Sequence, residues 1–470
     1  MSTFIDVKRF DFLKNNEKLV SVLKTIYKEG GVAYLVGGSV RDLILNKPLK
    51  DLDIEVHKLP LEDFQNVLEK FGFVKLVGKQ FGVLRLENVD VDWSIPRQDS
   101  KGRKPLVIFD PYMTLKDACK RRDLTINAMA IDLKFLTEKN AQEQIEVLDP
   151  FEGFEDLKNK KLKAIDNVLF LDDPLRFFRV MQFVGRFEME PDGELNEICK
   201  KIDLSEIARE RIFEELCKLF LKSRRPSLGI RWLKKIGRLK EIMPEVFALV
   251  SVQQRSDHHP EGNVFEHTMQ ALDAAAMSDK YESEKEKLTM LFAALCHDFG
   301  KPIATTEDLR SIGHEKIGSE MVQPFMKRFT EDYEMIKAVE KLVLYHLLPW
   351  EFVEQNSSLK AYKRLALKLS PQTNLRQLAL LQMADSRGRN AKSDLPLAGQ
   401  EEIFEKFMQK AKEAFVENKP EVPVLHGRDL MDVISPGKEM GELLKKAYEI
   451  QIDEGIKDKE ELKKLILKKE

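Results

Sequence analysis

The first 150 residues alternate between short apolar runs and amphipathic segments, a pattern that predicts strands alternating with helices. Residues 32–36 (VAYLV) form an apolar run that stops at Gly37-Gly38, as a strand stops at a tight turn. Ser39 follows this turn, and we expect it to cap a helix. Residues 51–56 alternate acidic and aliphatic positions, the period of a strand, and residues 81–95 contain a similar pattern. We therefore expect mixed α and β structure in this part of the chain.

From about residue 155 onward the pattern changes to helical periodicity. The change is clear in DPLRFFRVMQFVGRF (173–187) and ERIFEELCKLFLK (210–222), and proline and glycine become sparse within long segments. Six of the eight histidines lie between residues 258 and 346, which marks that region as a candidate module of its own. The Lys/Glu-rich segment from Glu442 onward is typical of a solvated helix.

Composition narrows the class of protein. The chain has 470 residues, 43% hydrophobic and 33% charged, which is ordinary for a soluble globular protein of two to four domains. With a net charge of −2, any polyanionic partner must be bound by local basic patches. The four scattered cysteines form no CxxC pair, which disfavours a zinc ribbon or a disulfide framework and fits a reducing cytoplasm. We find no apolar run of about 18 residues and no export signal, so we expect no membrane association.

The acidic residues of the predicted strands are the first candidate for chemistry. Asp51 and Asp53 project from the same face of a strand, since residues two apart share a face. Neighbouring carboxylates repel each other unless a cation lies between them. Asp90 and Asp92 repeat the arrangement on a second predicted strand, and oxygen ligands of this kind suit Mg²⁺. The alternative for an isolated DxD is a solvent-facing strand edge.

Other features near this pair favour a bound triphosphate. The Gly37-Gly38 turn permits close approach of the backbone, and the predicted helix that follows offers free N–H groups. No Walker A motif is present, because VGKQFG (77–82) and PGKEMG (436–441) lack its ending and spacing. The phosphates would instead be held by the turn, by metal ions and by cations such as Arg121 and Arg122.

Four motifs in a fixed order carry a resemblance to a known family. GGSVRD (37–42), DLD (51–53), RRDLTINAMA (121–130) and DDPLRFFR (172–179) resemble the class II tRNA nucleotidyltransferases. These are the CCA-adding enzymes of the DNA polymerase beta-like superfamily, together with the bacterial poly(A) polymerases. The resemblance is close over the first 220 residues and looser beyond. It implies an α+β head with a polymerase beta-like mixed sheet, followed by an all-α neck, body, HD domain and tail. The domains expected from it are a nucleotidyltransferase head at 1–150, a helical base-recognition neck at 151–240, an HD domain at 241–395 and an RNA-binding tail at 396–470.

The resemblance also assigns roles to individual residues. It implies that Asp51 and Asp53 bind the catalytic Mg²⁺ and that Asp92 supplies a third acid on the neighbouring strand. The residues that it implies for nucleotide binding are Gly37, Gly38, Arg41, Arg121, Arg122, Asp123, Asn127, Asp172, Asp173, Arg176 and Arg179. At the position of Asp172 the family usually has Glu, so this chain departs from the family pattern there.

Asp173 and Arg176 are the candidates for choosing the base. Residues three apart share a helix face, and an acceptor-only carboxylate beside a donor-only guanidinium matches the edges of cytosine and adenine. The alternative is that Asp173 caps the helix and Arg176 forms a surface ion pair.

The histidine-rich region predicts a second metal site. His267, the doublet His297-Asp298 and the later His314, His346 and Asp385 are spaced too far apart for one helix, so the ligands would converge from several. A mixed set of histidines and carboxylates suits a divalent transition metal or Mg²⁺ better than a closed structural zinc site. The region resembles the HD phosphohydrolase superfamily, whose pattern is H…HD…D. The alternative for each lone histidine is a satisfied core residue.

Several functions follow from these features, and the favoured one is addition of CCA to tRNA from CTP and ATP, with an additional HD phosphohydrolase activity. A poly(A) polymerase would share the same metals and chemistry. A third possibility is an HD-centred phosphohydrolase whose N-terminal half only binds RNA, which the intact DLD disfavours. A purely structural RNA binder is disfavoured by the two ligand sets. The sequence indicates no oligomeric state.

Overall fold

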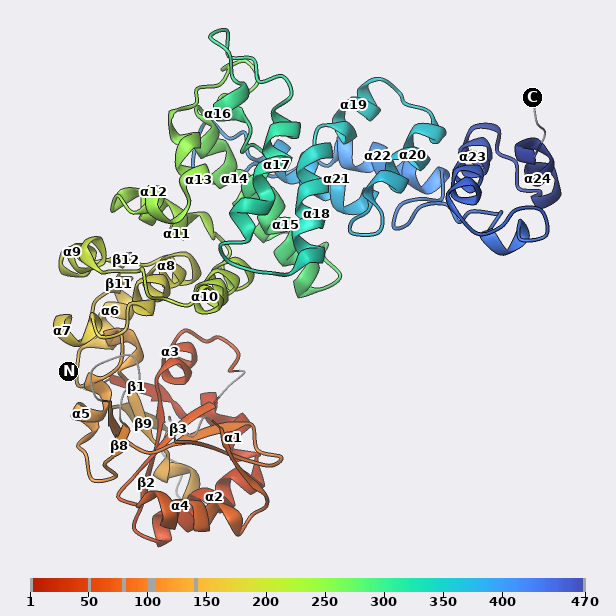
Figure 1. The fold of residues 1–470 in the computed structure, drawn as a ribbon. Coiled ribbons are helices and arrows are strands. Elements are labelled where there is room, and N and C mark those ends of the chain that lie inside the picture. The colour runs from red at the N-terminus through yellow and green to blue at the C-terminus, as the bar shows by residue number, and fades with distance from the viewer. Residues whose placement is uncertain (1–2, 50–51, 78–81, 100–106, 139–142, 468–470) are drawn as a thin grey trace. The chain divides into compact units, whose positions relative to one another are not determined.

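The computed structural model describes residues 3–49, 52–77, 82–99, 107–138 and 143–467. The chain divides into two compact units, residues 1–207 and residues 208–470. Figure 1 shows that the first unit contains the strands and the second is built from helices. This is the expected fold class, an α+β head followed by helical structure.

A mixed sheet forms the centre of the first unit. Within the described residues it has six strands, in the order β4 (Val74–Val77), β5 (Val83–Leu86), β6 (Val91–Ser94), β3 (Leu52–His57), β2 (Val32–Val36) and β9 (Ala130–Asp132). The β3–β6 pair is parallel and the other neighbouring pairs are antiparallel. The parallel pair aligns the two acidic strands predicted from the sequence.

The turn after β2 differs in one respect from the prediction. Helix α3 (Gly38–Ile44) begins directly after Gly37, which has a φ of +68° and is itself the N-cap, so Ser39 does not cap the helix. The Ser39 hydroxyl instead accepts a 3.1 Å hydrogen bond from the backbone N–H of Asp53. The serine thus connects the glycine turn to the acidic strand.

Helices pack around this sheet. In Figure 1, α2 (Glu17–Lys28) and α4 (Leu61–Glu69) lie side by side against it, and their apolar faces bury Leu23, Ile26 and Phe64. The other helices of the unit are α1 (Asp11–Lys14), α5 (Leu115–Lys120), α6 (Gly153–Lys158), α7 (Asn167–Phe170), α8 (Leu175–Phe187) and α9 (Gly193–Lys201), with 3₁₀ helices at Val7–Phe10, Thr125–Asn127 and Leu133–Thr137.

Three small two-stranded sheets are also present among the described residues of the first unit. They are β1 (Thr3–Asp6) with β10 (Gln144–Val147), β7 (Arg97–Asp99) with β8 (Val107–Phe109), and β11 (Lys161–Leu162) with β12 (Glu190–Pro191). The last pair lies in the part of the chain that was expected to be wholly helical. Its two-residue strands are too short to give a detectable alternation in the sequence.

The second unit is helical, as predicted. Its helices are α10 (Arg209–Lys222), α11 (Ser227–Lys235), α12 (Leu239–Ile242), α13 (Pro244–Ala248), α14 (Val264–Met277), α15 (Glu284–Cys296), α16 (Lys301–Ala304), α17 (His314–Met326), α18 (Tyr333–Tyr345), α19 (Leu348–Glu354), α20 (Leu359–Leu369), α21 (Leu375–Arg387), α22 (Glu402–Glu413), α23 (Lys438–Glu454) and α24 (Lys459–Leu467), with 3₁₀ helices at Leu249–Ser251 and Gly427–Asp429. Helices α14, α15, α18 and α21 pack together around the histidine-rich region. Among the described residues, no helix has the length and hydrophobicity needed to cross a membrane.

Candidate active sites in the two units

The acidic strands bring two carboxylates together in the first unit. Asp53 on β3 lies directly beside Asp92 on β6 in the parallel register. The guanidinium of Arg85 is bound to Asp92, with Nη2 3.1 Å from Oδ2. Asp51 lies outside the described residues. Adjacent carboxylates on neighbouring strands offer the oxygen ligands that Mg²⁺ prefers, so these residues fit such an ion.

Glu55, two residues after Asp53, is a buried carboxylate that the sequence analysis did not identify. It forms ion pairs with Arg121 at 3.2 Å and Arg122 at 3.9 Å, and it lies 3.1 Å from Nε2 of His57. Burial alone would raise the pKa of Glu55, but the hydrogen bond to His57 and the charges of both arginines lower it to about 2. Glu55 therefore stays ionised and holds both arginines beside the acidic strand.

Gly37 brings its backbone close to this cationic group. A Cβ atom at Gly37 would lie 2.5 Å from Nη1 of Arg122 and 3.9 Å from Oδ2 of Asp53. Its positive φ also disfavours any residue with a side chain. The turn therefore lies between the acid and the arginine, which is where the sequence predicted close backbone approach to phosphates.

A second polar network connects the glycine turn with helix α8. Buried Arg41 donates to Oδ1 of Asn127, whose Nδ2 donates to Asp123 at 2.8 Å. Asp123 also accepts a 2.6 Å hydrogen bond from Nε of Arg179, on α8. Burial alone would raise the pKa of Asp123, but the charge of Arg179 and the hydrogen bond from Asn127 lower it to about 2. The network fixes the RRD segment against the helix that was predicted to recognise the base.

The proposed base-reading pair is bound to backbone groups in this structure. Oδ1 of Asp173 accepts from the N–H of Leu175 at 3.2 Å, but the N-cap of α8 is the next residue, Pro174, which makes no side-chain cap. Arg176 donates to the carbonyls of Leu169 at 2.6 Å and Arg121 at 2.7 Å. The two side chains therefore lie at the start of α8, and Arg176 contacts the same RRD segment as the network above.

In the second unit, the six predicted metal ligands converge. His267 lies on α14, the His297-Asp298 doublet directly follows α15, and Asp385 lies on α21. His314 is the first residue of α17 and His346 directly follows α18. The ligand atoms of His267, His297 and Asp385 lie within 4.8 Å of one another, as do those of Asp298, His314 and His346. Each residue of both sets is buried.

Backbone carbonyls fix the orientation of the histidines. Nδ1 of His297 lies 2.8 Å from the carbonyl of Ala294, and the corresponding contacts of His314 with Ser311 and of His346 with Val343 are 2.7 Å. A carbonyl can only accept, so each Nδ1 carries a proton, and each Nε2 is left to face the cluster. These imidazoles are therefore oriented as metal ligands.

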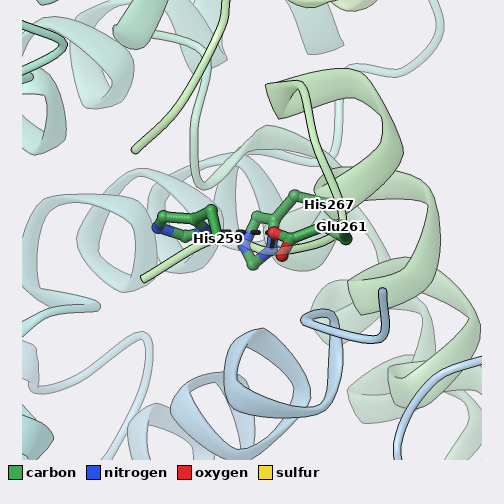
Figure 2. Close-up of side chains that lie close together, drawn as sticks. All are labelled: His259, Glu261 and His267. Atoms are coloured by element: carbon green, nitrogen blue, oxygen red, sulfur yellow. Dashed lines mark hydrogen bonds and ion pairs between the residues drawn. The ribbon is translucent and has the colours of Figure 1, made fainter. Parts of the chain in front are cut away.

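His267 is oriented by a carboxylate as well (Figure 2). Its Nδ1 lies 2.8 Å from Oε1 of Glu261, which also binds Nδ1 of His259 at 2.9 Å. Burial would lower the pKa of His267, but its hydrogen bonds to Asp385 and Glu261 raise it to about 9. A metal ion bound at Nε2 of His267 would displace the proton that this nitrogen carries in the charged imidazole. A carboxylate behind a ligating histidine fixes the ring and raises its basicity, and sequence reasoning missed Glu261 because a lone acid in EGN carries no motif.

An open pocket of about 580 Å³ gives access to this centre. Asp298, His314, His346 and Asp385 lie among its lining residues. The same pocket is lined by the cations Arg255, Lys301 and Arg389, and by the exposed apolar side chains of Ile312 and Trp350. The volume suits a small molecule of nucleotide size, with cations for its phosphate and an apolar surface for its base.

Comparisons with known proteins agree with this description. Three family profiles match the chain: the poly(A) polymerase head domain at residues 33–163, the probable RNA and SrmB binding site of polymerase A at 187–249, and the HD domain at 264–379. The multifunctional CCA protein of Mannheimia succiniciproducens is 32% identical over 370 residues, which cover 76% of this chain and 84% of that protein. The one from Nitrosospira multiformis is 34% identical over 322 residues, or 67% and 72% of the two chains.

Solved structures share the fold. The Thermotoga maritima CCA-adding enzyme complexed with tRNA matches with a TM-score of 0.59 at 21% identity, over 99% of each chain. The Bacillus stearothermophilus CCA-adding enzyme in complex with CTP matches with a TM-score of 0.65 at 18% identity, over 95% of this chain and 94% of that one.

The fold and the two residue clusters define a nucleotidyltransferase-type head joined to a helical unit with an HD domain. The chain belongs to the family of the multifunctional CCA proteins.

Proposed function

We propose that the chain completes tRNA 3′ ends by adding CMP and AMP residues from CTP and ATP. The observation that carries this proposal is the pairing of Asp53 with Asp92 on parallel strands, in a chain that belongs to the multifunctional CCA protein family. Solved structures of CCA-adding enzymes in complex with tRNA, with ATP and with CTP share this fold, which supports these partners. The proposed reaction is consistent with the cytoplasmic localisation that was expected from the sequence.

The head would bind Mg²⁺ through Asp51, Asp53 and Asp92. When bound, this ion neutralises phosphate charge and orients the reacting oxygens. The RNA 3′-hydroxyl oxygen attacks the α-phosphorus, the bond from that phosphorus to pyrophosphate breaks, and the hydroxyl proton passes to solvent. Catalysis of this kind consists mainly of positioning and charge stabilisation, which suits the arginines beside the acidic pair.

The triphosphate would lie against the Gly37-Gly38 turn, beside Arg121 and Arg122. The ion pairs of both arginines with Glu55 support this role, because they fix the guanidinium groups beside Asp53. The network of Arg41, Asn127 and Asp123 would position the turn, with Arg179 connecting it to α8. Asp172, Asp173 and Arg176 would recognise the base from the beginning of that helix.

The expected domain boundaries remain part of this proposal. Contacts divide the chain at residue 207, inside the expected neck at 151–240. The remaining boundaries are an HD domain at 241–395 and a tail at 396–470 that would bind RNA. A cluster of Leu425, Leu430, Met440, Ala447 and Ile466 gives the tail a small apolar core of its own, which supports treating it separately.

The test uses tRNA transcripts that end before CCA, after C and after CC. Each is incubated with CTP and ATP, and product lengths are read at nucleotide resolution. We expect every transcript to end in CCA and growth to stop there. Open-ended addition of A to all three would favour the poly(A) polymerase alternative, and no addition to any of them would contradict both.

We also propose that the helical unit is a metal-dependent phosphohydrolase that acts on phosphomonoesters or 2′,3′-cyclic phosphates. The observation that supports this second function is the set of fixed imidazoles around Asp298 and Asp385, at the base of a pocket lined by cations. In the reaction, a water oxygen attacks phosphorus, the phosphorus–oxygen ester bond breaks, and the alcohol leaves with a proton from the water.

A double substitution separates the two functions. His297→Ala with Asp298→Ala should remove ester hydrolysis and leave nucleotide addition unchanged, because the two sites share no residue. The assay supplies Mg²⁺, Mn²⁺, Co²⁺ or Ni²⁺ in turn. If the unaltered protein hydrolyses no such ester with any of these ions, the phosphohydrolase proposal is wrong.

A further inference from the structure

We infer that Lys75 and Arg85 bind the backbone of the acceptor RNA beside the acidic pair, and this inference rests on the nucleotide addition proposed above. Strands β4, β5, β6 and β3 are consecutive neighbours in the mixed sheet. Lys75 on β4 pairs with Arg85 on β5, which also pairs with Asp92 on β6. Asp92 in turn pairs with Asp53 on β3. Because side chains of paired residues point to the same face, two cations and two acids form one row across the sheet.

Both cations of this row face solvent. Leu84 and Leu86, the neighbours of Arg85 along β5, are buried, whereas the Arg85 side chain is 57% exposed. Lys75 is exposed as well, and it forms no ion pair with any described residue. Like charges directly opposite each other on antiparallel strands destabilise the pairing. The adjacency of Lys75 and Arg85 therefore costs stability unless an anion lies over both of them.

The acidic pair separates these cations from the proposed triphosphate. Gly37, which follows β2, lies on the other side of β3, where an added Cβ atom would be 3.9 Å from Oδ2 of Asp53. In phosphoryl transfer the attacking and leaving oxygens are roughly in line. With pyrophosphate leaving toward β2, the RNA 3′-hydroxyl approaches from the side of β6 and β5. The RNA that ends in this hydroxyl then runs over Arg85 and Lys75.

The strand spacing places the two cations at increasing distances from the acids. Neighbouring strands lie about 4.8 Å apart, so β4 with Lys75 is roughly 10 Å from β6 and β5 with Arg85 is half as far. Arg85 binds Asp92 through two contacts, one of them from Nη2 to Oδ2 at 3.1 Å. A guanidinium has five N–H donors and can bind a phosphate oxygen while it keeps a carboxylate. Arg85 would therefore hold the phosphate nearest the 3′ end, and Lys75 one farther from it.

An exposed aromatic ring accompanies the cations. Phe73, two residues before Lys75, is 71% exposed. Its carbonyl accepts a 3.0 Å hydrogen bond from the N–H of Glu87, which continues the pairing of β4 with β5. Residues two apart along a strand share a face. Sites for single-stranded nucleic acid combine cations for the phosphates with aromatic rings on which bases stack, so this combination favours RNA as the anion.

A surface ion pair is the main alternative for Arg85. In that case its guanidinium only neutralises Asp92, and exposed pairs of this kind contribute little to stability. The alternative gives no reason for a second cation, Lys75, directly beside the first. It predicts that loss of Arg85 changes the Mg²⁺ dependence of nucleotide addition and leaves RNA binding unchanged.

The salt dependence of RNA binding tests both cations. The full chain, without nucleotide, is titrated at several KCl concentrations with a fluorescent RNA hairpin that carries the single-stranded 3′ end of a tRNA acceptor. Each phosphate contact to a single strand contributes about 0.7 to the slope of log K against log salt. We expect Lys75→Ala and Arg85→Ala each to reduce the slope by about 0.7, and Arg85→Lys to retain it.

Two controls distinguish a local contact from a change in overall charge. Lys134→Ala removes the same charge from an exposed side chain that follows β9, at the opposite edge of the sheet, and should leave the slope unchanged. A hairpin with a blunt end lacks the single-stranded RNA, so it should show the same slope with every variant.

A neutral linkage locates the contact on the RNA. A methylphosphonate replaces each of the last internucleotide phosphates in turn, and CMP addition is measured in single turnovers. The replacement nearest the 3′ end should slow the unaltered protein about 10-fold and Arg85→Ala little further, because a contacting pair is energetically coupled. Lys75→Ala should be coupled to a linkage farther from the end. KM for CTP should not change in either variant.

The outcomes separate this inference from the function on which it rests. Unchanged slopes in Lys75→Ala and Arg85→Ala would overturn it, as would reduced slopes without coupling at any linkage. A raised KM for CTP with an unchanged slope would assign Arg85 to the triphosphate instead. Reduced slopes in a protein that adds no nucleotide would contradict the proposed function and leave the RNA contact standing. If Arg85→Ala does not fold, the comparison of Lys75→Ala with Lys134→Ala still decides.

Discussion

Asp53 and Asp92 lie directly opposite each other on parallel strands β3 and β6. Strands that are distant in the chain thereby present two carboxylates at one point of the sheet. Parallel register leaves both residues on the same side, because side chains of paired residues point the same way.

We expect Asp53→Asn and Asp92→Asn each to slow nucleotide addition by about 10²-fold or more, since either change removes charge that neutralises the phosphate-bound cation. Asp90→Asn is the matched control, because Asp90 is exposed just before β6. Single-turnover addition of CMP to tRNA measures the effect. Equal rates in the Asp90 and Asp53 variants would contradict the assignment.

Gly37 gives a second prediction. Alanine at this position meets a φ of +68° and places Cβ 2.5 Å from Nη1 of Arg122, so it should strain the turn and displace the arginine. Gly30→Ala is the control, because Gly30 has a φ of +86° with no atom within 4 Å of its Cβ. Both changes should destabilise the first unit by about 1–2 kcal/mol, and only Gly37→Ala should also raise KM for CTP and ATP. A KM that rises equally in both variants would show that Arg122 is not involved.

Asp123 predicts how the stability of the first unit depends on pH. Its pKa is lowered to about 2 by Arg179 and Asn127 against the effect of burial, below the usual value of about 3.9. The ionised carboxylate therefore stabilises the folded unit above about pH 4, by roughly 2 kcal/mol, and this contribution is lost as the pH falls toward 2.

Urea unfolding of Asp123→Asn measures this contribution. Trp93 is buried in the first unit, and replacing Trp232 and Trp350 with Phe makes it the sole reporter. We expect the unaltered protein to exceed the variant in stability at pH 7, with the difference shrinking as the pH is lowered below 4. The exposed Asp90→Asn should show little difference at any pH. A difference for Asp123→Asn that is independent of pH would mean that its charge is not the cause.

Glu261 predicts a graded loss of metal affinity. Its carboxylate accepts from Nδ1 of His267 at 2.8 Å, although the carbonyl of Gly388 lies 3.1 Å from the same nitrogen. Glu261→Gln keeps an acceptor and loses the charge, whereas Glu261→Ala loses both. We expect Ni²⁺ or Mn²⁺ affinity to fall about 10–100-fold in the alanine variant and less in the glutamine variant. Glu320→Gln, on the exposed face of α17, should bind metal normally, and isothermal titration would detect any departure.

Local pattern was enough to predict the strand at 32–36 and the helical remainder. The local pattern could not predict contacts between residues that are brought together by strand register and folding. Glu55 shares a strand face with Asp53 and was visible in DLDIEV, but its role depends on arginines brought near only by folding. Ser39 has a strong capping preference, yet the positive φ of Gly37 let that residue cap α3 and freed the hydroxyl for Asp53.

For the histidine-rich site of the helical unit, the sequence pattern again predicted some features and not others. The convergence of these side chains from several helices could be predicted from the spacing of the histidines and aspartates. The grouping into two sets could not, since it depends on which side of Asp298 each helix end reaches. Glu261 was not predicted for a related reason. It is a loop residue six positions before His267, and its carboxylate reaches Nδ1 of His267 only because the chain bends between them.

The last prediction concerns base choice at the start of α8. In this structure Asp173 accepts from the N–H of Leu175, and Arg176 donates to two backbone carbonyls. Reading a base would require both side chains to exchange these partners for the edge of cytosine or adenine, which offers an amino donor beside a ring acceptor. Uracil and guanine place a carbonyl and an N–H at those positions, so both contacts fail, at roughly 1–3 kcal/mol for each unpaired group.

The cap and the base-reading role therefore differ in outcome. If Asp173 only caps the helix, Asp173→Ala lowers the stability of the first unit and affects all four nucleotides alike. If it reads the base, the same change narrows the preference for CTP over UTP and for ATP over GTP by about 10-fold or more. Asp173→Asn is the matched variant, because it retains a cap acceptor but presents an amide donor to the base. Exchanging the pair, with Asp173→Arg and Arg176→Asp, should favour UTP and GTP. Single-turnover incorporation of each nucleotide decides between the roles, and unchanged ratios in the exchanged protein would exclude base reading by this pair.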